Sequence, residues 1–250
     1  MQRPFQTPIK LKSSITFILS AQISDMKKLI FTIIICCFAG LFSVYAQTLK
    51  LDKNKPEAVN VSVSMTRLMG KEAVKVIKDS AVKEFDEPTF AKVNGIEFSD
   101  GTIEVSVLSR LLPAAPEWAR GFIGVAFRIN DSNSKFESIY IRPANGRANN
   151  QLRRNRSIQY FSFPGYKFER LRKEAPGEYE SYADMGLNEW IKLKIVVKDT
   201  HAKLFINDNK HPSLIVNDLK HGANASGAIG LWVDEGTEGF FSDLKIQKDK

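Results

Sequence analysis

Residues 139–172 read "IYIRPANGRANNQLRRNRSIQYFSFPGYKFERLR" and hold seven arginines, four asparagines and six aromatic residues in 34 positions. Arginine binds carboxylates and sulfates through a planar fork of donors, and aromatic rings offer flat apolar surfaces. Together these side chains suit a sugar, above all an acidic one. Basic residues interleaved with aromatics are also typical of proteins that bind single-stranded nucleic acid. A third interpretation is a solvated loop whose arginines pair with nearby glutamates.

The side chains predicted to contact a ligand combine polar groups with aromatic platforms. They are Arg128, Tyr140, Arg142, Asn145, Arg147, Gln151, Arg153, Tyr160, Tyr166 and Trp232. Residues 144–157 are too polar for a strand, and residues 164–179 form a second long excursion. Loops of this length in a compact β domain usually serve function.

Glycoside cleavage normally requires a pair of carboxylates. Asp184 is the candidate acid or base, although such a carboxyl more often belongs to a structural ion pair. The three histidines share no ligand spacing, so no metal site is predicted. No cofactor is predicted, and a structural calcium ion in the oxygen-rich loops 130–133 and 233–238 stays open as an alternative.

Residues 26–46 have the pattern of a secretory signal peptide, with two lysines, an apolar run and small residues at the end. The apolar run at 29–44 has 16 residues, fewer than the roughly 20 that a spanning helix needs. We expect cleavage between Ala46 and Gln47, a secreted or periplasmic protein, and no stable membrane anchor. Both cysteines lie inside this segment, so the remaining chain has no thiol chemistry.

The expected organisation is one domain behind a removable leader. Residues 1–25 are interpreted as a mis-called upstream extension, 26–46 as the signal peptide, 47–57 as an N-terminal segment and 58–250 as the domain. The first 46 residues hold five of the 36 basic residues and one of the 28 acidic ones, so the net charge falls from +8 to +4 without them. That modest charge, with export, argues against nucleic acid as a partner.

Apolar and polar residues alternate from residue 59 onward, with turn formers such as Asn94-Gly95 between the segments. Many short strands with regular turns predict an all-β sandwich or barrel. The predicted strands are 59–65, 101–111, 121–129, 136–143, 158–163, 190–199, 202–208, 213–218, 227–233 and 239–247. Short helical turns are expected at most at 114–121 and 168–174.

Two kinds of strand differ on the face that points away from the core. Strand 190–199 presents lysines there, as expected of a solvated sheet. Strands 121–129 and 227–233 present glycine and alanine, with Arg128 and Trp232 at the ends. Because glycine and alanine are poor choices for a solvated strand face, this face predicts either a ligand groove or a covering loop.

The C-terminal half carries a recognisable pattern. "NEWIKLKIVVKDTHAKLFINDNKHPSLIVNDL" (188–219) and "GAIGLWVDEGTEGFFSDLKI" (227–246) resemble the last strands of the concanavalin A-like lectin/glucanase superfamily. Within it, the chain looks like secreted 3-keto-disaccharide hydrolase-like, or family-16-like, domains. The resemblance covers residues 57–248. It implies a jelly-roll sandwich of two antiparallel sheets, one convex and one concave, with ligands on the concave side.

The resemblance does not extend to the Glu-x-Asp-x-Glu catalytic strand of family-16 glucanases, because the sequence contains no such string. We therefore expect an exported carbohydrate-recognising jelly-roll domain that binds a glycan or oligosaccharide, with anionic sugars well suited, on a concave face lined by arginines and aromatics. The alternative is a glycoside hydrolase of the 3-keto-disaccharide hydrolase-like type. Whether the protein is an enzyme, which sugar it takes and its oligomeric state are left open.

Overall fold

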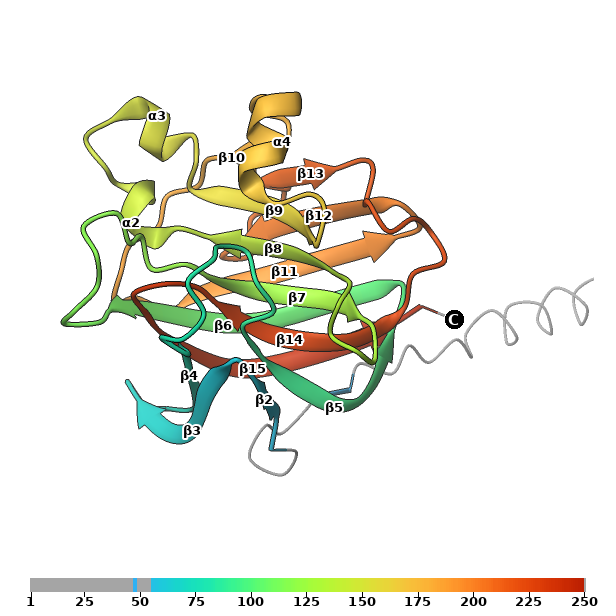
Figure 1. Cartoon of the computed structure of the whole chain (residues 1–250), viewed down its shortest axis with the longest axis horizontal. Helices are drawn as coiled ribbons and strands as arrows, with labels where there is room; N and C mark the ends of the chain where they lie inside the picture. The colour runs from blue at the N-terminus through green and yellow to red at the C-terminus, as the bar shows by residue number, and fades with distance from the viewer. Residues whose placement is uncertain (1–46, 49–54, 250) are drawn as a thin grey trace, which may run out of the picture. The chain divides into compact units, whose positions relative to one another are not determined.

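The alternating segments form antiparallel strands that pair into two sheets (Figure 1). The computed structural model describes residues 47–48 and 55–249. The predictions for residues 1–25 and 26–46, including the cleavage site, lie outside the described residues. All ten predicted strands are present, because a strand with one buried face must place an apolar side chain at every second position.

In the described part of the chain, one sheet has eight strands in the order β13-β12-β11-β6-β15-β4-β3, with β1 paired to β15. All its pairings are antiparallel. Its strands are β1 (Gln47–Thr48), β3 (Val61–Leu68), β4 (Lys71–Lys78), β6 (Gly101–Leu111), β11 (Ile191–Lys198), β12 (His201–Ile206), β13 (Leu214–Val216) and β15 (Thr237–Lys248).

The second sheet has seven strands in the order β10-β9-β8-β7-β14-β5-β2, again counted over the described residues. It is antiparallel throughout. Its strands are β2 (Glu57–Val59), β5 (Phe90–Phe98), β7 (Ile123–Ile129), β8 (Phe136–Ile141), β9 (Ile158–Phe163), β10 (Glu180–Ser181) and β14 (Gly227–Val233).

Short helices interrupt the connections on either side of β9. They are α2 (Pro143–Gly146), α3 (Gln151–Arg154) and α4 (Phe168–Glu174). The helical turn expected at 168–174 is therefore present, whereas 114–121 contains only turns. The side chain of Asn150 accepts a hydrogen bond from the Arg153 backbone N–H, which caps the start of α3.

The two sheets pack face to face around one apolar core, as the jelly-roll prediction required. The predicted core side of β11 is buried, from Ile191 to Val197. On β15, Gly239 leaves room for Val233 and Ile123 of the opposite sheet, since a Cβ atom would lie 2.6 Å from Val233. The fold class is thus an all-β sandwich of two antiparallel sheets.

The outer face of the seven-stranded sheet is covered by the connection between β4 and β5, residues 79–89. Figure 1 shows this connection crossing in front of β14 and β7. Thr89 donates to the carbonyl of Val233 at 2.6 Å, and the indole of Trp232 donates to the carbonyl of Glu87 at 2.9 Å. Gly230 makes room for the Phe90 ring, because a Cβ atom there would meet Phe90 Cγ at 2.8 Å. Aromatic side chains of neighbouring strands, together with the covering connection, therefore explain much of the small-residue face.

The prediction of a turn at Asn94-Gly95 was wrong. Both residues lie inside β5, where the register with β14 shifts between Gly227 and Ile229. Gly95 has φ of +73°, which a glycine adopts without strain. The Asn-Gly pair forms a bulge in a strand, and this is a known alternative use of the same backbone conformation.

Candidate functional site

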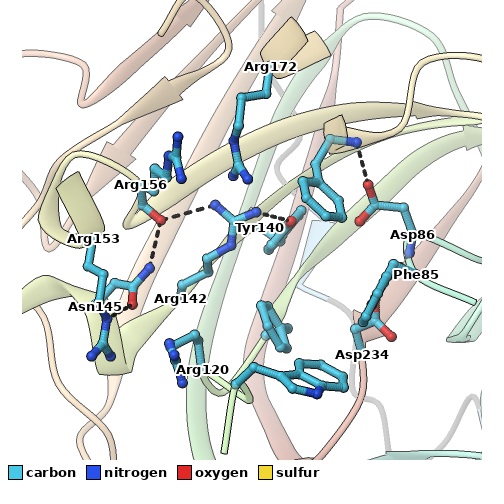
Figure 2. Close-up of a pocket in the computed structure, with 13 residues that line it drawn as sticks. Phe85, Asp86, Arg120, Tyr140, Arg142, Asn145, Arg153, Arg156, Arg172 and Asp234 are labelled. Carbon is cyan, nitrogen blue, oxygen red and sulfur yellow. Dashed lines mark hydrogen bonds between the residues drawn. The ribbon is translucent and has the colours of Figure 1, made fainter. Parts of the chain in front are cut away.

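A cavity of about 320 Å³ opens on the outer face of the seven-stranded sheet (Figure 2). Its size falls at the lower end of the range of about 300–1,000 Å³ that is typical of small-molecule sites. The residues that line it are Phe85, Asp86, Trp118, Arg120, Phe122, Tyr140, Arg142, Asn145, Arg153, Arg156, Phe168, Arg172 and Asp234. They come from the β4–β5 and β6–β7 connections, β8 and the residues after it, α3, α4 and the end of β14.

Arg142 lies in the pocket wall directly after β8 and is held by protein groups. Its Nη2 atom donates to the Tyr140 hydroxyl at 2.6 Å, and its Nη1 atom donates to the carbonyl of Arg156 at 3.1 Å, as Figure 2 shows. The guanidinium carbon lies 4.9 Å from the centre of the Tyr140 ring. Because these donors are already engaged, Arg142 fixes the shape of the pocket.

The carboxylate of Glu180 in β10 is shared by three arginines that line the pocket. It accepts from Arg172 at 2.6 Å and from Arg142 at 3.3 Å, and Nε of Arg156 lies 3.5 Å from it. Only 6% of the Glu180 side chain is exposed. One negative charge against three positive ones leaves this end of the pocket cationic, and partly buried charges are weakly screened.

The other polar end of the pocket contains Arg120, Asn145 and Arg153. Arg120 lies on the β6–β7 connection and donates to two nearby backbone carbonyls, each at 2.7 Å. Arg153 in α3 donates from Nε to the Asn145 side chain at 3.2 Å. These partners are neutral, so they orient the two guanidinium groups without cancelling their charge.

Aromatic rings form the opposite wall. Phe85 makes edge contacts with Trp118 at 5.0 Å and with Phe168 at 6.0 Å between ring centres. Phe122 lies 6.4 Å from Trp118 and 6.3 Å from Tyr140. Trp118 is 43% exposed, which is high for a tryptophan. The pocket therefore pairs a cationic wall with an accessible aromatic platform.

Asp86 is a buried carboxyl group in the pocket wall. It adopts a φ of +53°, and one carboxylate oxygen accepts from the backbone N–H of Phe168 at 2.7 Å. Its own N–H donates to Asp234, whose carboxylate forms a buried ion pair with Lys78. Burial, reinforced by the negative charge of Asp234, raises the pKa of Asp86 to about 7.

Four of the ten residues predicted to contact a ligand line this cavity: Tyr140, Arg142, Asn145 and Arg153. The strand end and the loop that follows it bring them together, as the alternation in β8 indicated. The other six lie elsewhere, and their surroundings explain why.

Arg128 and Trp232 were predicted at the ends of an open groove, and the structure corrects both. The Arg128 side chain is fully buried at a strand end, where it pairs with Asp100 at 2.9 Å and donates to three backbone carbonyls. Trp232 is also fully buried, beneath residues 86–89. For Trp232 the alternation indicated the correct side of the sheet, but it did not reveal that other parts of the chain cover that side. Arg128 has a φ of +55° where the register between β7 and β14 shifts, and its side chain binds Asp100 and the carbonyl of Asp199 next to strands of the other sheet.

Tyr160 and Tyr166 also lie outside the pocket lining. Tyr160 points into the sandwich, where its buried hydroxyl donates to Glu137 at 2.6 Å. Tyr166 packs beneath Arg170, whose guanidinium carbon is 4.2 Å from the ring centre. Both tyrosines therefore have structural partners.

Arg147, Gln151 and Asp184 lie on the protein surface away from the pocket. Arg147 makes paired hydrogen bonds with Asp184 at 2.9 and 3.1 Å, and Gln151 donates to Asn155 at 2.7 Å. The hydrogen bonds from Arg147 hold the pKa of Asp184 below its usual value. Asp184 thus resembles a surface ion-pair partner more than an acid or base.

The pocket residues that sequence reasoning missed are Phe85, Asp86, Trp118, Arg120, Phe122, Arg156, Phe168, Arg172 and Asp234. Three of them, Arg156, Phe168 and Arg172, belong to the opening arginine stretch. Asp234 directly follows β14, and the other five come from connections 79–89 and 112–122, which lack the periodicity that guided the strand assignments. Aromatic residues in those connections were the available signal.

Among the described residues, no group of three or more His, Cys, Asp or Glu side chains is placed to hold a metal ion. The calcium alternative in loops 130–133 and 233–238 stays a prediction. No helix within the described part of the chain has the length and apolar character needed to cross a membrane.

No protein-family model matches the chain, and the curated proteins contain no match either. Solved structures resemble it in fold. A Bacillus subtilis protein of unknown function with a galectin-like fold is 11% identical, covering 82% of this chain and 95% of its own, with a TM-score of 0.48. A carbohydrate-binding module from Bacillus subtilis is 12% identical over 76% of this chain and 98% of its own, with a TM-score of 0.45.

A galectin from Caenorhabditis elegans is 12% identical, covering 65% of this chain and 99% of its own, with a TM-score of 0.37. These are similarities of architecture alone. At such low identity they assign no ligand to this chain, and the two-sheet topology of the chain itself carries the fold class.

Proposed function

We propose that the protein is an exported carbohydrate-recognising domain that binds an acidic glycan in the arginine-lined pocket. The observation that carries the proposal is the composition of the pocket wall: five arginines face aromatic rings across a cavity of about 320 Å³. Guanidinium groups bind carboxylates and sulfates with matched geometry. An accessible ring such as Trp118 supplies the apolar platform that a sugar face requires.

The carboxyl groups of the pocket are arranged in a way that favours ligand binding over hydrolysis. Two carboxylates, Asp86 and Asp234, line the cavity, and glycoside hydrolysis normally employs such a pair. Asp234, however, is engaged by Lys78 and by the backbone N–H groups of Asp86 and Glu235. A carboxylate held by three donors is a structural group, which leaves Asp86 without a catalytic partner.

The test is calorimetric titration of the purified protein with uronate and sulfated oligosaccharides and with neutral ones of equal length. We expect binding of the acidic sugars only. Arg156→Gln should weaken it at least about tenfold, as expected for the loss of a charge-assisted contact. Arg147→Gln is the matched control, because Arg147 is in the same arginine-rich segment but lies outside the pocket. Equal affinity for neutral sugars would contradict the proposal.

The hydrolase alternative has one observation in its favour, which is Asp86. A carboxyl group with a pKa near 7 inside a cavity is suited to proton transfer. A screen of glycosides with wild-type protein and Asp86→Asn would decide between the two functions. If the wild-type protein cleaves a glycoside and the variant does not, the protein is a hydrolase. If the wild-type protein binds a glycoside without cleaving it, the proposal of recognition alone is supported.

Export is the part of the proposal that depends on residues 26–46. The signal-peptide pattern supports it. Sequencing the N-terminus of protein from the periplasm or medium should give Gln47 as the first residue. A product that keeps Met26 and fractionates with membranes would show instead that the segment is retained.

A further inference from the structure

We propose that the pocket takes a sugar ligand with two separate anionic groups, one at Arg156 and Arg172 and the other at Arg120 and Arg153. The inference rests on the proposed function and narrows its ligand class. The ligand would be an acidic mono- or disaccharide that carries, for example, both a carboxylate and a sulfate. A single anionic group would engage only one end of the pocket.

The two arginine pairs are held apart by different parts of the fold. Arg156 follows α3 and Arg172 lies on α4, and both reach Glu180. Figure 2 shows these two on one side of Arg142, with Arg120 on the other side. The engaged guanidinium of Arg142 therefore separates two cationic ends.

Both ends keep donors that face no protein acceptor. Among the described residues, no group accepts a hydrogen bond from either Nη atom of Arg156 or from Nη1 of Arg172. In the same part of the chain, Arg120 uses only Nη1, and Arg153 uses Nε and Nη2, with Nη1 left over. Each pair can thus donate to an incoming anion without breaking a contact.

Neither end is neutralised by the protein. The first end has the single carboxylate of Glu180, which it shares with Arg142. The hydrogen-bond partners of Arg120 and Arg153 are backbone carbonyls and an amide, and within the described residues no carboxylate forms an ion pair with either. The charge of Glu117 acts on Arg120 in the opposite direction to that of Arg153, but more weakly. Two separate excesses of positive charge favour two separate negative charges on one ligand.

The arginines also repel one another. Burial and then the charge of Arg153 lower the pKa of Arg120, while burial and then the charge of Arg172 lower the pKa of Arg156. For each of the two arginines, the like charge that lowers its pKa most belongs to the other arginine at the same end of the pocket. An anion bound at each end would relieve this repulsion.

The experiment compares one-anion and two-anion forms of the same sugar by calorimetry. The probes are an unsulfated uronate disaccharide of the chondroitin type, its 6-O-sulfated form, lactose and sodium sulfate. On the wild-type protein we expect the sulfated form to bind at least about tenfold more tightly than the unsulfated form. Lactose and sulfate alone should bind far more weakly than either.

Variants at the two ends then separate the contributions. Arg156→Gln and Arg120→Gln should each reduce the affinity for the sulfated form at least about tenfold. One of these two variants should bind the unsulfated form as tightly as the wild type does, because a single carboxylate occupies only one end of the pocket. Arg153→Gln is a second variant of the Arg120 end, and it keeps the test valid if Arg120→Gln does not fold. Arg147→Gln remains the control.

The outcomes distinguish this inference from the proposed function. Equal affinities for the unsulfated and sulfated forms would overturn the two-anion inference while leaving acidic-sugar binding intact. Binding of sodium sulfate as tightly as the sulfated sugar would overturn both, because the site would then recognise an anion without a sugar. No binding of any acidic sugar would reject the proposed function itself.

Discussion

The outer faces of the two sheets both carry basic residues, but they differ in the number of carboxylates that pair with each basic side chain. On the eight-stranded sheet, Lys192 lies between Asp208 at 2.7 Å and Glu104 at 3.3 Å, so two carboxylates surround one cation. On the seven-stranded sheet, three arginines share Glu180 alone. A functional basic surface is marked by cations in excess of their partners, and the number of basic residues says little by itself.

The faces also differ in what lies above them. Lys192 and Lys194 are half-buried side chains on an open strand. The seven-stranded sheet is covered by residues 79–89 and by α4. The cavity opens beside these two segments. Charge interactions strengthen where protein atoms replace surrounding water. The same charge therefore has larger consequences on the covered face.

The largest expected effect concerns the shared carboxylate. Glu180→Gln should destabilise the protein by about 3–5 kcal/mol, because it leaves three partly buried guanidinium groups without their anion. Urea unfolding at pH 7 measures the change. Glu104→Gln on the lysine face is the matched control and should cost less than about 1 kcal/mol. Similar losses in both variants would remove the contrast between the faces.

The second effect concerns Asp86, whose pKa of about 7 exceeds the usual 3.8 of an unfolded aspartate. A carboxyl group with a raised folded pKa contributes stability below the unfolded pKa and loses it as the pH rises to the folded pKa. Stability should fall from pH 4 to pH 7, by up to about 4 kcal/mol for this group. The surrounding charged groups are Asp234, Arg142 and Lys167.

Asp86→Asn should remove this part of the pH dependence and make the variant more stable than the wild type at pH 8. Asparagine tolerates the left-handed backbone and can still accept from Phe168, so the change is conservative. Asp184→Asn is the control with the opposite sign. The pKa of Asp184 is lowered, so its contribution is lost as the pH falls. If the difference in the free energy of unfolding between wild type and Asp86→Asn does not change with pH, the raised pKa of Asp86 is contradicted.

The sequence was sufficient for the sandwich, because a strand between a core and solvent leaves a period-two pattern. It indicated the lysine face of β11 correctly for the same reason. It was insufficient for β4 and β5, which were not predicted. In β5 the bulge at Asn94-Gly95 shifts the alternation, and this breaks the pattern that identifies a strand.

The site was only partly predictable, for a physical reason. Tyr140 and Arg142 were found because the direction of a side chain follows from its place in a strand. Arg128 and Trp232 were misplaced because burial depends on distant segments, and no local pattern shows that residues 86–89 lie over Trp232. Asp86 and Trp118 were missed because they sit in connections whose path is set by tertiary contacts.

The third effect combines the cavity with its titrating group. An anionic sugar should bind more tightly at pH 6 than at pH 8, since Asp86 loses its negative charge on protonation. We expect a several-fold change, measured by calorimetry at constant ionic strength. Asp86→Asn should bind with little dependence on pH across this range. A wild-type affinity that rises with pH would show that Asp86 does not face the bound anion.

The smallest effect is expected from the lysine face, and it separates a defined sugar site from a general cationic surface. A ligand held by two anionic groups releases few counterions, so raising salt from ~50 to ~200 mM should weaken it about tenfold or less. Single-stranded DNA that contacts about six cations would lose a hundredfold or more in affinity over the same range.

The double variant Lys192→Ala with Lys194→Ala should leave sugar affinity unchanged, because these charges lie on the other sheet and exposed charges farther away than about 10 Å are screened. If the lysine variant weakens binding as much as Arg156→Gln does, the affinity depends on the total charge of the protein, and the distinction between the two faces fails. A shallow salt response that depends on the arginines alone would instead show that recognition belongs to the pocket on the covered face.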